Sequence, residues 1–196
     1  MLIVANWKAY VEELAKAKKL FALGKRLATG AGLSIVLAPS APILGLLAAK
    51  NKSKVAFAAQ DVSLSTGGAH TGETTAQALV AVGATYAIIG HSERRAAGDT
   101  DVIVGEKLAH ALAHGLTPIL CVGEKERDGE GRYLAVVREE LTTSIGSLAP
   151  KERAKVIIAY EPLWAIGKTA DAAIGPNDLA EMVLYIRKVL AELLPG

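Results

Sequence analysis

Six short apolar runs recur along the chain, and their spacing constrains the fold more than any other feature of the sequence. Each run is four or five residues long, lacks a clean alternation of apolar and polar residues, and is bounded by polar or turn-forming residues. Such runs are typical of parallel strands that are buried on both faces. We therefore predict six strands, over residues 2–5, 34–38, 55–59, 86–90, 118–122 and 156–160.

The segments between these runs carry helical patterns, over residues 11–28, 102–113, 133–148 and 179–194. Asp178 precedes Glu181 by three residues, a spacing that resembles a capping box with Asp in place of Ser or Thr at the start of the last helix. Strands that alternate with helices predict an α/β fold. The period of about 30 residues for each βα unit suits either a doubly wound sheet or a β/α barrel.

Composition places the chain among single-domain globular proteins. With 51% apolar and 21% charged residues it is not disordered, and residues 1–196 contain no linker rich in Gly, Pro or Ser. The single Cys excludes an internal disulfide framework, and the net charge of +2 indicates neither nucleic acid nor an anionic membrane as a partner. There is no apolar run of 18 residues and no signal-peptide pattern. We therefore expect a cytoplasmic protein without a membrane span.

Polar residues follow almost every predicted strand, and this distribution favours the barrel. A β/α barrel builds its active site from side chains at the carboxyl ends of several strands. A doubly wound dinucleotide-binding domain is disfavoured because no Gly-x-Gly-x-x-Gly follows the first strand. A Walker A motif and a Cys/His cluster with zinc spacing are also missing from the sequence. The polar clusters lie at residues 6–8, 60–61, 91–95, 121–124 and 160–162.

Four motifs at these strand ends carry a specific resemblance. They are Asn6-Trp7-Lys8, Gly-His-Ser-Glu-Arg-Arg at 90–95, Cys-Val-Gly-Glu at 121–124, and Ala-Tyr-Glu-Pro-Leu-Trp-Ala-Ile-Gly at 159–167. Taken together and in this order, they make the chain resemble the triosephosphate isomerase family along almost its whole length. A fifth segment, Gly-Ala-His-Thr-Gly-Glu at 68–73, is similar to the family loop that crosses the dimer interface.

The resemblance implies a reaction in which a proton moves between two carbons of a triose phosphate through an enediolate. Glu161 is then the expected base, and its desolvation would strengthen it for that task. His91 is the expected electrophile, as a neutral imidazole, and Lys8 would place a cation near the enediolate and the phosphate. Asn6 would donate a hydrogen bond to a substrate oxygen. Gly167 would offer its backbone N–H to the phosphate. The resemblance calls for no metal and no organic cofactor.

The resemblance also implies a lid, and its apolar residues would exclude water from the reaction. The expected lid residues are Pro162, Leu163, Trp164, Ala165, Ile166, Gly167 and Lys168. A homodimer is the expected assembly, with Thr71 bracing the partner's site. The expected interface residues are Gln60, His70 and Thr71.

Other polar residues near these motifs have structural interpretations. We expect Glu93, Arg94 and Arg95 to form an ion-pair network that holds the loops rather than to take part in chemistry. We expect Cys121 to be a small buried apolar residue and not a nucleophile.

The chain departs from the family pattern in two places. Gly167 is followed directly by Lys168-Thr169, where the family often has Thr-Gly before the Lys, so the far hinge of the lid is altered; a longer stretch over 171–176 would compensate. After the sixth strand only the lid and one helix follow, whereas such barrels usually have eight strands in about 250 residues. The seventh and eighth strands, with their glycine-rich phosphate loops, are missing. The first and sixth strands would then be unpaired edges.

Three hypotheses follow from this pattern. The first is an isomerase whose six-unit barrel is completed by another chain or by rearrangement. The second is a non-catalytic fragment or assembly module that associates with itself through its open edges. The third is a different phosphosugar enzyme with a barrel fold, which the colinear motifs disfavour.

Overall fold

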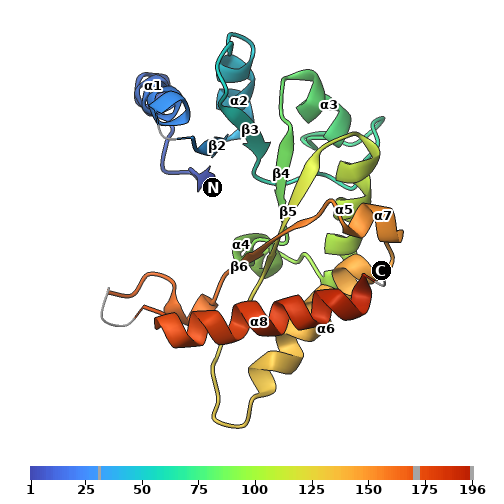
Figure 1. Ribbon diagram of the computed structural model, residues 1–196. Coiled ribbons are helices and arrows are strands. Elements are labelled where there is room, and N and C mark those ends of the chain that lie inside the picture. The colour runs from blue at the N-terminus through green and yellow to red at the C-terminus, as the bar shows by residue number, and fades with distance from the viewer. Residues whose placement is uncertain (31, 170–172, 195–196) are drawn as a thin grey trace. The chain divides into compact units, whose positions relative to one another are not determined.

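The computed structural model describes residues 1–30, 32–169 and 173–194. The chain forms two compact units, one of Met1–Ile89 with His110–Pro118 and the other of Gly90–Ala109 with Ile119–Gly196. Figure 1 labels the elements along the chain, from blue at the N-terminus to red at the C-terminus. The proposal of a single domain over residues 1–196 stays a prediction, and each unit is described by itself.

All six predicted strands are present, with bounds that differ from the prediction by no more than one residue at either end. They are parallel, and they follow chain order within each unit: β1 to β4 in the first, and β5 beside β6 in the second. This alternation of parallel strands and helices confirms the predicted fold class, an incomplete β/α barrel of the TIM type with six βα units. The strands are β1 (Leu2–Asn6), β2 (Ser34–Ala38), β3 (Ala56–Ala59), β4 (Tyr86–Ile89), β5 (Thr117–Val122) and β6 (Ile157–Tyr160).

The four predicted helical segments are also confirmed, as α1 (Leu14–Gly30), α5 (Asp101–Ala113), α6 (Arg132–Gly146) and α8 (Pro176–Leu193). Shorter helices fill the remaining connections: α2 (Ala41–Ala48), α3 (Ala76–Ala81), α4 (Ser92–Ala96), α7 (Pro150–Arg153) and the 3₁₀ turn η1 (Leu163–Ala165). In the described parts of the chain, no helix combines the length and the apolar character that crossing a membrane would require.

The start of α8 differs from the prediction. Gly175 is the N-cap residue, and Asp178 lies inside the first turn instead of capping it. The reason is Pro176, which occupies the first helical position, where its fixed φ suits a helix and its missing N–H costs nothing. Asp178 instead pairs with Arg127, at 3.2 Å between its carboxylate and the guanidinium. The predicted capping box with Glu181 was therefore wrong.

Burial of the strands follows their position in the sheet. β2, β3, β4 and β5 each have at least three buried residues, but β1 and β6 have none. The predicted burial on both faces was therefore wrong for β1 and β6. Among the described strands each of these two has a single hydrogen-bonded neighbour, so less of its surface is covered. Leu2 and Ile3 of β1 are each 38% exposed.

The core of the first unit lies between its helices and its strands. Phe21 of α1 packs against Phe57 of β3, with ring centroids 5.5 Å apart in a tilted arrangement. Leu44 of α2 is fully buried in the layer of helices that covers β2 and β3. Burial of these large side chains supplies the main free energy that holds the strand ends in place.

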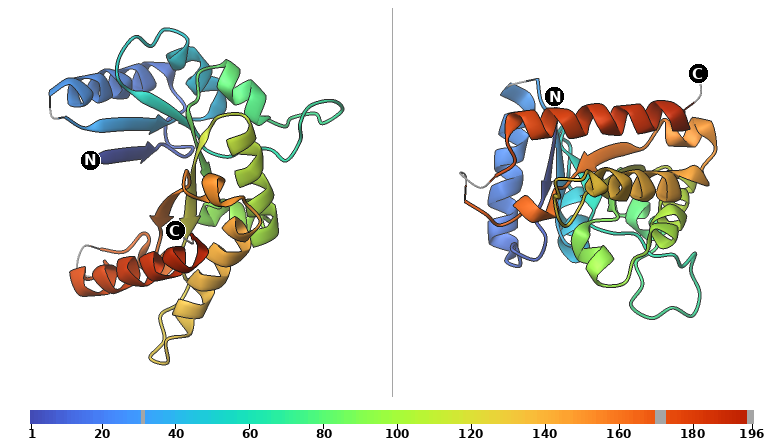
Figure 2. Two further views of the ribbon diagram at one scale, coloured as in Figure 1. Left: turned by 45° about the vertical axis from the view of Figure 1, so that its right-hand side comes forward. Right: turned by 90° about the horizontal axis from the view of Figure 1, so that it is seen from below.

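The second unit is built around α6 and α8, which lie side by side (Figures 1 and 2). Leu141 of α6 and Met182 of α8 are fully buried. On the exposed side, Arg138 of α6 donates to Glu192 of α8 at 2.7 Å. This helix pair is the scaffold from which α6 reaches the loops that follow β4 and β5.

Candidate active site

His91 and Glu161 form a close pair in the second unit. His91 caps the N-terminus of α4, directly after β4, and Glu161 follows β6. The Nε2 atom of His91 lies 3.2 Å from Oε1 of Glu161, and His91 is only 7% exposed. The other ring nitrogen, Nδ1, accepts the backbone N–H of Glu93 at 3.2 Å. In a neutral ring the proton therefore sits on Nε2, which donates to Glu161.

The backbone fixes the second oxygen of Glu161. Oε2 accepts the N–H of Ser92 at 3.3 Å, and the N–H of Glu161 itself donates to the carbonyl of Val122 at 2.8 Å. The carboxylate is thus held between the first turn of α4 and the end of β5. Such contacts position a base without a further side chain.

Gly123 allows the loop after β5 to pass close to Glu161. A Cβ atom at this position would overlap the backbone carbonyl of Glu161, so no residue other than glycine fits without a shift of the backbone. Its N–H donates to Oε2 of Glu140 on α6, at 2.8 Å. The glycine of the Cys-Val-Gly-Glu motif therefore has a packing role next to the proposed base.

Glu124 is a buried carboxylate at the base of the predicted lid. It is 1% exposed and accepts hydrogen bonds from the hydroxyl of Tyr160, at 2.8 Å, and from Nε1 of Trp164, at 2.7 Å. The guanidinium of Arg127 lies 3.7 Å away. Burial and the carboxylate of Glu124 both raise the pKa of Tyr160 above its ordinary value. These contacts hold the first part of the lid against the loop after β5.

Arg127, which lies beside Glu124, contacts further residues around the first part of the lid. Its guanidinium lies over the rings of Tyr133, at 4.5 Å from the centroid, and Trp164, at 5.7 Å, and it pairs with Asp178 of α8. The sequence analysis missed Arg127 and assigned Glu124 no role. Only the position of Glu124 in a strand-end motif could have drawn attention to it.

The exposure of the predicted lid residues increases along the segment. Pro162 to Ala165 are half-buried, and the N–H of Leu163 donates to the carbonyl of Glu124 at 3.0 Å. Ile166, Gly167 and Lys168 are exposed. Gly167 has φ of 73°, in the left-handed region that favours glycine. Residues 170–172, which belong to the expected far hinge and its compensating stretch, lie outside the described residues.

Asn6 and Lys8 lie together at the end of β1 in the first unit. Oδ1 of Asn6 accepts the N–H of Lys8 at 2.9 Å. Lys8 has φ of 47°, and it is the one non-glycine residue with positive φ in the described parts of the chain. Gln60 donates from Nε2 to the carbonyls of Lys8, at 2.9 Å, and of Ala38, at 2.8 Å. Strained backbone of this kind is concentrated at functional sites.

The predicted interface residues divide between two places. Gln60 is half-buried and braces the backbone of Lys8, as described above, whereas His70 and Thr71 are exposed. The loop that carries His70 and Thr71 projects from the rest of its unit (Figure 2). Gly68 and Gly72 give it two left-handed turns. Its role at an interface stays a prediction, as does the convergence of Asn6 and Lys8 with His91 and Glu161.

Arg95 is the centre of the expected ion-pair network. Its guanidinium pairs with Asp101, and its Nε donates to the carbonyl of Gly90 at 2.8 Å. Arg94 lies 3.7 Å from Asp99. Cys121 is buried, as expected, and burial raises the pKa of its thiol to about 12. It is therefore protonated at neutral pH and a poor nucleophile.

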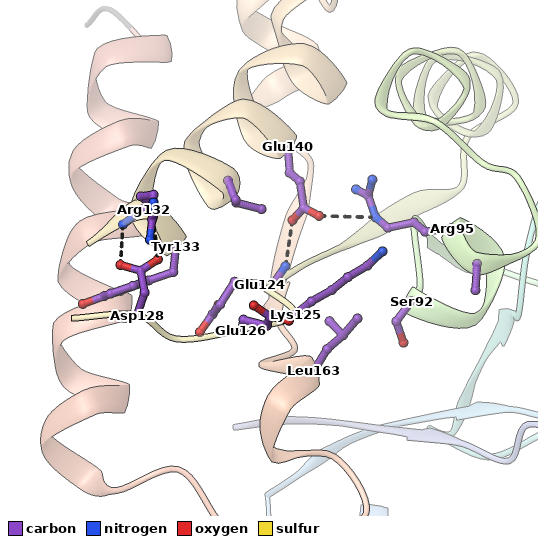
Figure 3. Close-up of a pocket in the computed structure, with 13 residues that line it drawn as sticks. Ser92, Arg95, Glu124, Lys125, Glu126, Asp128, Arg132, Tyr133, Glu140 and Leu163 are labelled. Atoms are coloured by element: carbon purple, nitrogen blue, oxygen red, sulfur yellow. Dashed lines mark hydrogen bonds and ion pairs between the residues drawn. The ribbon is translucent and has the colours of Figure 1, made fainter. Parts of the chain in front are cut away.

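A cavity of about 530 Å³ lies in the second unit, and neither His91 nor Glu161 is among its lining residues (Figure 3). Ser92, which follows His91, and Leu163, two residues after Glu161, both line it. Arg95 and Glu140 line it as well, and their side chains point toward each other.

Comparison with known proteins agrees with this geometry. The family model described as triosephosphate isomerase matches residues 1–195. A relative from Symbiobacterium thermophilum named triosephosphate isomerase is 38% identical over 194 residues, which is 97% of this chain and 75% of the relative. Relatives of the same name from Thermus thermophilus and Chloroflexus aurantiacus are each 40% identical, over 98% of this chain and 77% of their own length. The chain belongs to the triosephosphate isomerase family.

Proposed function

We propose that the chain interconverts glyceraldehyde 3-phosphate and dihydroxyacetone phosphate through an enediolate, without a metal or an organic cofactor. The observation that carries this proposal is the His91–Glu161 pair, with 3.2 Å between Nε2 and Oε1. Glu161 is a carboxylate held by backbone groups. His91 is an imidazole whose neutral tautomer points its Nε2 proton at that carboxylate. Proton transfer between adjacent carbons needs such a base and such a donor.

In this reaction Glu161 takes the proton from the carbon next to the substrate carbonyl. The bonding electrons move into the new carbon–carbon double bond, and the carbonyl oxygen gains negative charge. His91 gives its Nε2 proton to that oxygen and takes up the hydroxyl proton of the neighbouring oxygen, so that the negative charge passes to the second oxygen. Glu161 returns the proton to the other carbon, which completes the exchange of aldehyde and ketone.

The remaining predicted residues have supporting roles. Lys8 supplies positive charge for the enediolate and the phosphate, and Asn6 donates a hydrogen bond to a substrate oxygen. The strained backbone of Lys8, braced by Gln60, supports the view that the position of this side chain matters. Gly167 offers its N–H to the phosphate. The lid, residues 162–168, closes over the substrate and excludes water.

We expect a protein of these 196 residues to bind the substrate phosphate weakly. The relatives extend beyond the matched part by about a quarter of their length, and the resemblance places glycine-rich phosphate loops in the seventh and eighth βα units. Each hydrogen bond to a charged group contributes about 1.5–3 kcal/mol. We expect this protein alone to turn over phosphorylated substrate poorly, with the defect in kcat/KM.

Isomerase assays on the purified 196-residue protein, with Glu161→Gln as the inactive control, test the proposal. Activity above that of the control supports it, and activity equal to the control contradicts it. The defect should be smaller for unphosphorylated glyceraldehyde. Addition of a chain that carries the last two βα units of a relative should raise activity on the phosphorylated substrate.

We further propose a homodimer in the cytoplasm, joined through the exposed loop around His70 and Thr71. The alternative of a non-catalytic module that associates through its strand edges is favoured by one observation, the half-exposed strands β1 and β6. Sedimentation of Thr71→Arg separates the two. Loss of the dimer in this variant supports the loop contact, and an unchanged assembly supports association through strand edges.

A further inference from the structure

Glu140 of α6 contacts two segments that adjoin the candidate catalytic pair, namely the loop after β5 and the helix α4. Its first contact is with the loop after β5, where Oε2 accepts the N–H of Gly123 at 2.8 Å. Gly123 in turn packs against the backbone carbonyl of Glu161 so closely that no Cβ fits between them. A shift of Gly123 therefore moves Glu161, or opens a gap behind it.

The second contact is with Arg95. The Oε1 atom of Glu140 lies 3.9 Å from Nε of Arg95, and Figure 3 shows the two side chains pointing toward each other. The same Nε donates to the carbonyl of Gly90 at 2.8 Å, and Gly90 directly precedes His91. Arg95 is thus the link between Glu140 and the backbone at the proposed electrophile.

We propose that Glu140 is a positioning residue for the reaction: its carboxylate braces Glu161 through Gly123 and braces His91 through Arg95 and Gly90. It touches neither member of the pair, so it acts only through these two backbone segments. The catalytic consequence rests on the proposed isomerase function, but the bracing itself does not.

The surroundings of Glu140 make this brace sensitive to pH. The pKa of Glu140 is raised to about 7: burial is the largest cause, the charge of Arg95 and the N–H of Gly123 oppose it, and the charges of Asp101 and Glu124 add to it. The Cys121 thiol, which also faces this group, stays protonated because its own pKa is about 12. Lys125 lines the same cavity, through which solvent reaches the carboxyl group.

Protonation of Glu140 weakens both arms of the brace. A neutral carboxyl group accepts the Gly123 N–H less strongly than a carboxylate does, and it no longer attracts the guanidinium of Arg95. Above a pH of about 7 the carboxylate form holds both loops. Below it the contacts of Glu161 with Ser92 and Val122 and the pairing of Arg95 with Asp101 remain, without the support of the Glu140 carboxylate.

The test is an NMR titration of the 196-residue protein between pH 5 and 9, which needs no catalytic activity. The Gly123 amide proton should move downfield as Glu140 ionises, with a midpoint near 7, and the Nε–H signal of Arg95, which faces Glu140 and the Gly90 carbonyl, should move with the same midpoint. Both changes should vanish in Glu140→Gln. The matched control is Glu139→Gln, which removes the same charge from the neighbouring, exposed residue of α6 and should keep both changes.

The proposal is overturned if the Gly123 signal does not titrate in the wild type, or if the titration of the Arg95 Nε–H signal survives in Glu140→Gln. Where isomerase activity is measurable, Glu140→Gln should lower kcat about tenfold with KM unchanged, and should remove the rise of kcat near pH 7. An unchanged kcat together with the expected NMR titration would limit the role of Glu140 to structure and contradict its role in positioning.

Discussion

The two regions that carry the proposed catalytic side chains hold them by different means. At the end of β1, the contacts described for the Lys8 backbone are made by the neutral side-chain amides of Asn6 and Gln60. In the second unit, carboxylates hold the segments next to His91 and Glu161: the buried Glu124 contacts Tyr160 and Trp164, and Glu140, whose pKa is raised, contacts Gly123.

This difference matters because neutral and charged groups respond differently to mutation and to pH. A neutral hydrogen bond contributes about 1 kcal/mol and does not titrate. A buried carboxylate can leave several unpaired partners when it is removed, and its own ionisation depends on its surroundings. The second region should therefore be the more fragile, and its stability should respond to pH through Glu140.

The largest expected effect is on Glu124. In Glu124→Ala the half-buried donors of Tyr160 and Trp164 and the charge of Arg127 lose their common acceptor. We expect the free energy of unfolding to fall by about 3–5 kcal/mol in urea titrations. Glu126→Ala, an exposed neighbour in the same loop, is the control and should change little. Equal free energies of unfolding for the two variants would contradict the proposal that Glu124 stabilises the first part of the lid.

Shortening the proposed base comes next. Glu161→Asp moves the carboxylate by about 1 Å, and such a misplacement lowers kcat on the order of 10²-fold. KM should change far less, because the substrate contacts of other residues stay in place. Steady-state kinetics decides the matter: a kcat equal to that of the wild type would remove Glu161 from the role of base.

A pH dependence distinguishes the two regions directly. The pKa of Glu140 is raised to about 7 in the folded chain, so between its unfolded value and 7 the folded state binds more protons than the unfolded state. Stability should therefore fall as pH rises through this window, by about 1–3 kcal/mol. In Glu140→Gln this fall should be absent. Chemical unfolding at pH 5 and pH 8 measures it, and parallel curves for the two proteins would contradict the raised pKa.

Gly123 tests the packing behind Glu161. In Gly123→Ala the new methyl group overlaps the Glu161 carbonyl, and we expect a loss of about 1–3 kcal/mol in stability together with a lower kcat. Gly129→Ala serves as the matched control, because a Cβ at that position meets nothing within 4 Å. If the two variants were equally stable and active, the close contact of Gly123 with the Glu161 carbonyl would affect neither stability nor activity.

The smallest expected effect lies in the first region. Gln60→Ala removes two neutral hydrogen bonds to the backbone of Lys8 and Ala38, so stability should fall by about 1–2 kcal/mol. The loss should be the same at pH 5 and pH 8. Gln77→Ala, at an exposed position of α3, is the control. A loss that varied with pH would remove the contrast between the two regions.

Much of the local structure was predictable from the sequence because it depends on local patterns. Apolar runs bounded by turn residues located all six strands, and the helical spacing of apolar residues located the four long helices. The start of α8 was placed wrongly because two local signals competed, and Pro176 outweighed Asp178. The positions after the strands predicted that Asn6, Lys8, His91 and Glu161 converge. His91 and Glu161 lie in contact, and the convergence of Asn6 and Lys8 with them stays a prediction.

The positioning residues depended on tertiary structure. Glu124 and Glu126 stand two residues apart in one polar segment, yet one is buried under the lid and the other is exposed. Glu140 is one of two adjacent acidic residues on α6, and only the packing of that helix turns it, rather than Glu139, toward Gly123 and Arg95. Sequence periodicity reports the average burial of an element, so it located the strands, the helices and the motif residues. Contacts between distant segments follow from how those elements pack, and that packing alone decided which carboxylates brace the pair.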